Sequence, residues 1–244
     1  MQRLILDPVQ IQPPMVHLVE HQVHYLGRVL RLGVGDRFIA LDGQGAAWIV
    51  QLTAKDTGTI IEPLDRPSEL PVALHLVIAL PKTGFDDIVR QATELGVSRI
   101  VPILSDRTVL QPSPQKLVRW QRIITEAAEQ SERQIVPTLA APISWTAHLA
   151  ECRDRPTPNH HFLGVTRFAA PHLLACPLPP PTTTHPITIA IGPEGGWTDT
   201  EIHTAIATGY QPISLGDRIL RTVTAPIVAL ALFAAIYEQG TVKE

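Results

Sequence analysis

Residues 187–202, with the sequence ITIAIGPEGGWTDTEI, decide the fold class. Their first five residues have the length and apolar composition of a strand buried on both faces, and the turn Gly192–Gly196 follows at once. A helix is predicted to begin at Thr198, because Thr198 and Glu201 have the spacing of a capping box. A glycine-rich turn between such a strand and a helix is typical of a ligand loop in a parallel α/β sheet, where bare backbone lets a ligand approach closely.

The charge of this loop narrows the kind of ligand. Its glycines fit neither the dinucleotide fingerprint nor a phosphate-binding loop, which would end in lysine followed by serine or threonine. Glu194, Asp199 and Glu201 gather at a predicted helix N-terminus, where their charge would repel a phosphate. A ligand with hydroxyl groups and positive charge but no phosphate fits better. S-adenosylmethionine has these features, although the residues alone do not single it out.

A second segment, Ser214–Pro226 with the sequence SLGDRILRTVTAP, repeats the order of strand, loop and helix. It turns at Gly216 and enters the last helix at its closing proline, a residue suited to a first helical turn. Ile219 and Leu220 offer apolar contact to an adenine, and Arg221 is placed to face an anionic substrate. Either loop alone is equally compatible with an ordinary tight turn, because short glycine motifs recur in unrelated proteins.

Strands and helices alternate around both loops, which predicts an α/β domain with a mainly parallel sheet. The predicted strands are residues 72–80, 99–104, 162–165, 187–191 and 212–215, and the predicted helices are residues 85–95, 115–131, 198–208 and 225–239. The first seventy residues have another pattern, typical of a small β-barrel, with strands at 3–6, 38–41, 48–52 and 59–64 and a helix at 19–31. The proline-bearing stretch 65–69 is the predicted boundary, so the expected domains are residues 1–69 and 70–244.

Composition limits the partners and the location. The 244 residues carry a net charge of −3 and only 5% aromatic residues, so any basic surface for a nucleic acid must be local. No secretory signal is apparent at the N-terminus, and the apolar stretch 225–236 is too short to cross a bilayer. We therefore expect a soluble cytoplasmic protein that does not associate with membranes.

No metal site is expected. Cys152 and Cys176 have no metal-ligand spacing and cannot form a disulfide framework. His17, His21 and His24 have the spacing of one helix face, but no carboxylate or cysteine completes a ligand set with them.

Taken together, the two loops resemble a known family. IGPEGG at 191–196 followed by LGDRILRT at 215–222 is similar to the RsmE family of the SPOUT class, which methylates N3 of a uridine in bacterial 16S ribosomal RNA. Similar segments run along nearly the whole chain: HYLGRVLR at 24–31 with Asp42-Gly43, ALPK at 79–82, ATELG at 92–96, SDR at 105–107 and EAAEQSER at 126–133.

The resemblance implies an α/β fold with a SPOUT-type C-terminal trefoil-knot domain and a small N-terminal PUA-like β-barrel domain that binds RNA. It also implies S-adenosyl-L-methionine as the cofactor, 16S ribosomal RNA within the small ribosomal subunit as the partner, and a homodimer. The cofactor-binding residues carried over by position are Leu163, Gly164, Gly192, Pro193, Glu194, Gly195, Gly196, Leu215, Gly216, Ile219, Leu220, Arg221 and Thr222.

Cations provide the remaining candidates. Arg221 is the candidate catalytic residue, because a cation near O2 or O4 stabilises the uracil anion that forms when N3 loses its proton. A salt bridge or a phosphate contact is the alternative for Arg221. The RNA-binding candidates are Arg28, Arg31, Lys82, Arg107, Arg122 and Arg133. For Arg122, on a basic helix stripe with Lys116 and Arg119, a solvated helix face is the alternative. Arg28 and Arg31 have the alternative of satisfying a helix dipole.

One position departs from the family pattern. The family usually reads LRTET where this chain has residues 220–224, so Val223 replaces a carboxylate beside the donor loop. If that carboxylate holds Arg221 or another donor of the loop, the site is stabilised differently here, which is the interpretation we favour. If it acts in catalysis, activity is lost. The alternatives for function are therefore a methyltransferase of the same fold acting on transfer RNA or 23S ribosomal RNA, and an inactive RNA-binding relative.

Overall fold

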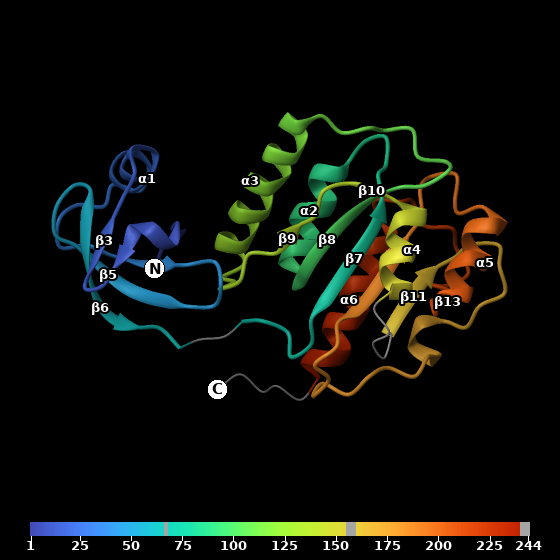
Figure 1. Cartoon of the computed structure of the whole chain (residues 1–244). Helices are drawn as coiled ribbons and strands as arrows, with labels where there is room; N and C mark the ends of the chain where they lie inside the picture. Colours follow the sequence, from blue (N-terminus) through green and yellow to red (C-terminus); the bar gives the residue numbers. More distant parts are fainter. Residues whose placement is uncertain (66–67, 155–159, 240–244) are drawn as a thin grey trace. The chain divides into compact units, whose positions relative to one another are not determined.

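The structure is a computed structural model that describes residues 1–65, 68–154 and 160–239 (Figure 1). The chain divides into two compact units. The first contains Met1–Glu69 together with Ala128–Val136, and the second contains Leu70–Ala127 and Pro137–Glu244. Of the predicted boundary at 65–69, residues 66 and 67 lie outside the described residues.

The first unit is a six-stranded sheet with one short helix. Its strands lie in the order β1-β4-β5-β6-β3-β2, and α1 continues into a π-helical turn at Tyr25–Val29. Their bounds are β1 Arg3–Ile5, β2 Ile11–Gln12, β3 Met15–His17, α1 Glu20–His24, β4 Arg37–Leu41, β5 Ala47–Leu52 and β6 Thr57–Pro63. The four predicted strands are present. β2 and β3 follow the 3₁₀ turn η1 (Pro8–Gln10) and are too short for an alternating pattern to reveal them.

Residues 128–136 belong to the first unit, and hydrogen bonds connect them to other parts of that unit. The backbone amide of Ile5 donates to Glu129 Oε1 at 2.7 Å, and Val136 donates to the carbonyl oxygen of Gly43 at 2.9 Å. Arg133 is only 3% exposed, and its Nε donates to Glu69 Oε2 at 3.0 Å. This buried ion pair ties the segment to the residue at which the first unit ends.

The second unit has a seven-stranded sheet in which every pair of strands is parallel, as predicted. The strand order is β10-β8-β7-β12-β11-β13, with β9 beside β8. The bounds are β7 Leu74–Ala79, β8 Val97–Leu104, β9 Thr138–Leu139, β10 Ile143–Ser144, β11 His160–Gly164, β12 Ile187–Ile191 and β13 Gln211–Ile213. β12 lies between β7 and β11 with all five residues buried, which explains its continuous apolar run.

Helices cover both faces of this sheet (Figure 1). α2 (Phe85–Glu94) and α6 (Ala225–Glu238) pack on one face, and α4 (Trp145–Asp154) and α5 (Asp199–Ala207) pack on the other. α3 (Pro114–Gln130) packs on α2 through Trp120, and the ring centroids of Trp120 and Phe85 are 4.3 Å apart. The sequence pattern did not predict α4, nor the 3₁₀ turn η3 (Leu173–Ala175). Among the helices of the described residues, none is long and apolar enough to cross a membrane.

A buried polar cluster lies at the amino ends of the strands, under α4. His148 Nε2 and the Tyr210 hydroxyl are hydrogen-bonded at 2.7 Å. The ring centroids of His161 and Tyr210 are 4.8 Å apart. Burial lowers the pKa of His75, His148 and His161 to about 4 each, with smaller contributions from neighbouring charges such as Arg99 beside His75 and His148. These three histidines are therefore neutral at neutral pH.

Candidate functional site

The carboxyl ends of five neighbouring strands form a pocket of about 640 Å³. The strands are β8, β7, β12, β11 and β13. In the same order, lining residues come from the end of each strand or the loop after it: Arg107, Thr83, Gly192–Trp197, Gly164–Phe168, and Leu215, Gly216 and Arg218–Val223. Parallel strands bring such loops together at one edge of the sheet, which is where α/β proteins bind ligands. The volume lies within the usual range of about 300–1,000 Å³ for small-molecule sites.

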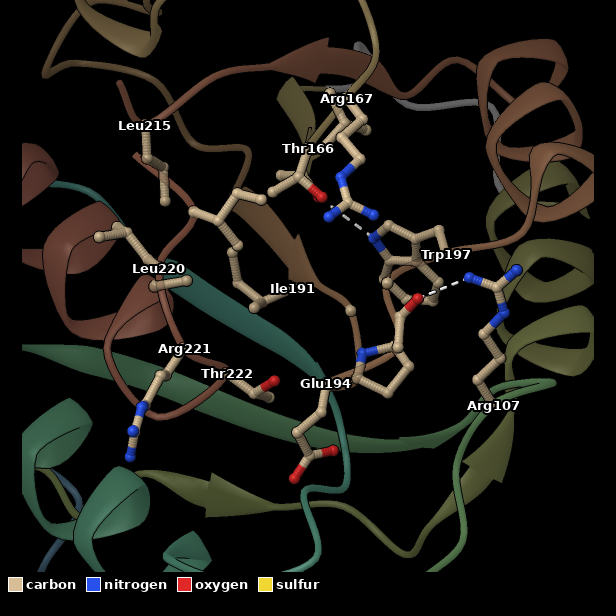
Figure 2. Close-up of a pocket in the computed structure, with 18 of the residues that line it drawn as sticks. Arg107, Thr166, Arg167, Ile191, Glu194, Trp197, Leu215, Leu220, Arg221 and Thr222 are labelled. Carbon is tan, nitrogen blue, oxygen red and sulfur yellow. Dashed lines mark hydrogen bonds between the residues drawn. The ribbon is translucent and has the colours of Figure 1, made fainter. Parts of the chain in front are cut away.

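Backbone forms the wall that the glycine loop contributes. A Cβ at Gly192 would stand 3.0 Å from Cε2 and Nε1 of the Trp197 ring, and Gly196 has a φ of +71°, where other residues are strained. The Trp197 indole donates to the carbonyl oxygen of Gly164 at 3.2 Å, which joins the loop after β12 to the end of β11 (Figure 2). Glycine is thus required by close packing at Gly192 and by backbone conformation at Gly196.

The carboxylates of this region have different roles. Glu194 is exposed, lines the pocket and accepts a hydrogen bond from the backbone amide of Lys82 at 2.9 Å. Asp199 also lines the pocket and is exposed. Glu201 is 6% exposed and accepts from the amides of Thr198 at 2.8 Å and Asp106 at 3.0 Å. The predicted capping box is confirmed, and Glu201, whose oxygens are buried in these hydrogen bonds, is not among the residues that line the pocket.

The loop after β13 provides apolar surface. Leu215 and Leu220 lie together on one side of the pocket, across from Trp197 and Arg107 (Figure 2). Ile219 lines the same pocket and is 63% exposed, so its apolar side chain is accessible to a ligand. This side of the pocket is suited to contact with a flat ring such as a nucleobase.

Arg221 and Val223 lie where this loop enters α6. The carbonyl oxygen of Arg221 accepts from the amides of Thr224 at 2.8 Å and Ala225 at 2.9 Å, which fixes the backbone, while its side chain is exposed and lines the pocket. A Cβ at Gly84 would stand 2.8 Å from Val223 Cγ1. Val223 therefore packs closely on the backbone at the start of α2, where a longer acidic side chain would have to turn elsewhere.

The structure brings together most of the candidate donor residues. Every one of them lines the pocket except Leu163, which is fully buried in β11 beside Gly164. The cation candidates are dispersed. Arg107 lines the pocket and donates to the carbonyl oxygen of Gly195, and Lys82 is exposed in the loop after β7.

The other RNA-binding candidates are not among the residues that line the pocket. Arg28 and Arg31 are exposed on the first unit. Arg122 is exposed on α3 and pairs with Glu126 at 3.4 Å, and Arg133 is the buried partner of Glu69. The ion pairs of Arg122 and Arg133 do not support contact with RNA.

Sequence reasoning missed several residues that line the pocket: Thr83, Thr166, Arg167, Phe168, Trp197 and Arg218. Two of them carried a signal, because Trp197 directly follows the glycine loop and Arg218 lies inside the second motif. Residues 165–168 carried none, since their place depends on β11 lying between β12 and β13. That strand order is a tertiary property which local periodicity does not contain.

Comparison with known proteins identifies the family. An RNA methyltransferase domain matches residues 68–234, and an RNA methyltransferase PUA domain matches residues 19–62. Ribosomal RNA small subunit methyltransferase E of Synechocystis is 49% identical over 97% of this chain and 78% of its own length. The Bacillus subtilis protein of the same name is 30% identical, with 95% of each chain covered. The chain belongs to this methyltransferase E family.

Solved structures agree with this assignment to the methyltransferase E family. The family member from Neisseria gonorrhoeae, bound to S-adenosyl methionine, is 30% identical with a TM-score of 0.86, covering 97% of this chain and 98% of the other. A putative methyltransferase from Legionella pneumophila, in complex with the same cofactor, is 28% identical with a TM-score of 0.80, covering 96% and 97%. The matches confirm the expected fold, a SPOUT-type α/β domain preceded by a PUA-like domain.

Proposed function

We propose that this protein transfers a methyl group from S-adenosylmethionine to N3 of a uridine in 16S ribosomal RNA. The observation that carries the proposal is the pocket at the carboxyl edge of the parallel sheet. It is built from the two loops whose sequences resemble the RsmE family, in a chain whose relatives are ribosomal RNA small subunit methyltransferases. A relative with the same fold was solved with S-adenosyl methionine bound.

The residues present fit this donor. The glycine loop lines the pocket largely with backbone, Gly192 packs against the Trp197 ring, and the side of the pocket around Leu220 is suited to the adenine. Glu194 and Asp199 supply negative charge for the ammonium and sulfonium groups. The proposed donor residues are those carried over by position. Leu163 supports Gly164 from within the sheet, and Arg221 enters the set through its backbone, which leaves its side chain for the substrate. When bound, the donor supplies a methyl group activated on sulfur.

The protein's part in the reaction is to position the base and stabilise its charge. N3 of uracil must lose a proton before it attacks the methyl carbon, and the displacement itself depends mainly on alignment. Arg221 makes no ion pair with any residue that the structure describes, so its guanidinium is available to the developing charge on O2 or O4. Val223 packs on Gly84, and the hydrogen bonds that the Arg221 carbonyl oxygen accepts from Thr224 and Ala225 fix the Arg221 backbone without a carboxylate at position 223.

The proposal includes the larger assembly. Residues 1–69 form the RNA-binding domain and residues 70–244 the catalytic domain, whose C-terminal part is threaded as a trefoil knot. The enzyme works in the cytoplasm as a homodimer on RNA within the small ribosomal subunit. Arg28, Arg31, Lys82 and Arg107, all of them exposed, are the RNA contacts retained from the sequence candidates.

Primer extension tests the reaction and its substrate. N3-methylation blocks the Watson–Crick face of uridine, so reverse transcriptase stops there. We expect 16S RNA from cells that lack this protein to lose one stop, and the wild-type gene to restore it. If the stop pattern on 16S RNA is unchanged and a stop is lost from 23S or transfer RNA instead, that RNA is the substrate in place of 16S RNA.

Calorimetry tests the donor separately. We expect the purified protein to bind S-adenosylmethionine with a dissociation constant below about a millimolar, which is about −4 kcal/mol. Absence of binding at that concentration would indicate the inactive relative. A matched catalytic control is Arg221→Ala, which should bind the donor and fail to restore the stop.

A further inference from the structure

The pocket carries positive charge that the chain as a whole does not have. Four arginines line it, whereas only Glu194 and Asp199 line it as carboxylates, although the net charge of the chain is −3. The four are Arg107, Arg167, Arg218 and Arg221. A nucleic-acid site in an acidic protein has to be a local patch of this kind, because the phosphate backbone dominates affinity.

Arg167 lies in a short turn between two residues that pack in the core, Val165 and Phe168. Val165 is 8% exposed, and Phe168 packs on the same core cluster with its ring 6.3 Å from that of His203. The turn between these anchors gives Arg167 a φ of +57°, a left-handed conformation that is uncommon for residues other than glycine. A strained residue of this kind at the rim of a pocket is characteristic of functional loops.

Arg218 projects from the loop after β13, between Gly216 with its φ of +118° and the exposed Ile219. Within the described residues neither Arg218 nor Arg167 has an ion pair or a side-chain hydrogen bond. The arginines of α2 and α3 are different. Arg90 pairs with Glu94 at 3.1 Å and Arg119 with Asp86 at 2.6 Å. Two exposed guanidinium groups on two loops of one pocket are therefore left for an external anion.

We propose that Arg167 and Arg218 bind phosphate groups of the RNA strand next to the nucleotide that enters the pocket. The guanidinium group matches phosphate through two parallel N–H···O bonds, and it keeps its charge at every physiological pH. The proposal rests on the proposed function, because it takes RNA as the substrate of this pocket. It assigns these two arginines to the RNA, whereas the glycine loop and the two carboxylates hold the donor.

Salt-dependent binding of 16S RNA tests the assignment. The variants are Arg167→Ala, Arg218→Ala and their combination, with Arg153→Ala as the matched control, because Arg153 is an exposed arginine of α4 outside the pocket lining. For each single variant we expect RNA affinity to fall about three- to tenfold and the log–log salt slope to fall by about 0.7–0.9. Donor affinity should stay within about twofold, and Arg153→Ala should match the wild type.

Three outcomes would overturn the assignment. They are an unchanged RNA affinity, an unchanged salt slope, and a loss of donor affinity equal to the loss of RNA affinity, which would make these arginines ligands of the donor carboxylate. Arg167→Gly separates binding from folding, because glycine adopts a φ of +57° without strain and the thermal midpoint should not fall. If the wild type binds RNA but shows no methyl transfer, the proposed function is wrong, and the RNA affinities of the variants still test the arginine assignment.

Discussion

Polar side chains are mostly buried at one end of the parallel sheet and exposed at the other. At the amino ends, His75 and His161 of the sheet and His148 of α4 are mostly buried, and the Tyr210 hydroxyl is hydrogen-bonded to His148. At the carboxyl ends, charged side chains such as Arg221 lie exposed around a pocket. The difference shows that burial and pairing, rather than the number of polar residues, separate a polar cluster that supports the fold from one that is open to a ligand.

The largest effect is expected at the carboxyl ends, from Arg221→Ala. If Arg221 stabilises the charge of the uracil, its loss should lower kcat by about a hundredfold or more. Donor affinity should change by less than about threefold, since the glycine loop and Glu194 are untouched. Single-turnover methylation of 16S RNA, with calorimetry of donor binding, measures both. Unchanged turnover would remove Arg221 from catalysis, and Arg221→Lys should retain part of the rate if charge alone matters.

At the amino ends we expect an effect on stability that depends on pH. The folded pKa of each buried histidine is about 4, below the value of 6.5 in the unfolded chain. Their stabilising contribution is therefore complete above about pH 6.5 and is lost as the pH falls toward 4, because only the unfolded chain takes up these protons. The slope is about 1.4 kcal/mol per pH unit for each proton. Chemical denaturation at a series of pH values measures it.

His161→Phe is the variant that tests the source of this slope. Among the residues that the structure describes, the buried His161 Nδ1 atom has no hydrogen-bond partner, so phenylalanine should fill its place against Tyr210 at little cost. Between pH 6.5 and 4 the slope should decrease by about one proton. A slope unchanged by His161→Phe would mean that His161 does not titrate as its burial predicts. Methylation at pH 7.5 should be unaffected, since His161 is not in the pocket lining.

A smaller effect is expected from Gly192→Ala, which adds one carbon to the pocket wall. That carbon would meet the Trp197 ring at 3.0 Å and displace the indole that donates to Gly164. We expect donor affinity to weaken about tenfold, or about 1.4 kcal/mol. Gly33→Ala is the matched control, because nothing lies within 4 Å of a Cβ at that position. Equal donor affinity in both variants would show that Trp197 can move without changing the part of the pocket that binds the donor.

The sequence revealed the fold where burial leaves a local pattern. β12 was predicted because all five of its residues are buried, and the start of α5 was predicted from Thr198 and Glu201. The sequence placed Glu201 correctly at the start of this helix but did not reveal its burial, in which it accepts hydrogen bonds from the amides of Thr198 and Asp106. Burial of a charge depends on a loop that lies far away in the sequence, and no local pattern reports it.

The rim of the site was hidden for a related reason. Residues 165–168 contain no motif, and they reach the pocket only because β11 lies between β12 and β13. Arg133 shows the same limit from the other side. It belongs to a segment that resembles the family, yet the fold buries it against Glu69. Motifs therefore predicted the glycine-bearing loops of the site. Which arginines and lysines can contact a ligand depends instead on the strand order and on the ion pairs of the folded chain.

The smallest effect is expected from Arg122→Ala on α3. Arg122 is exposed and pairs with Glu126 one helical turn away at 3.4 Å, so truncation removes an intrahelical pair that contributes only about 0.3–0.5 kcal/mol. We expect RNA affinity within about twofold of the wild type and no change in the salt slope. The same titration with Arg167→Ala provides the contrast between a paired and an unpaired arginine. If Arg122→Ala weakened RNA binding as strongly, α3 would belong to the RNA-binding surface.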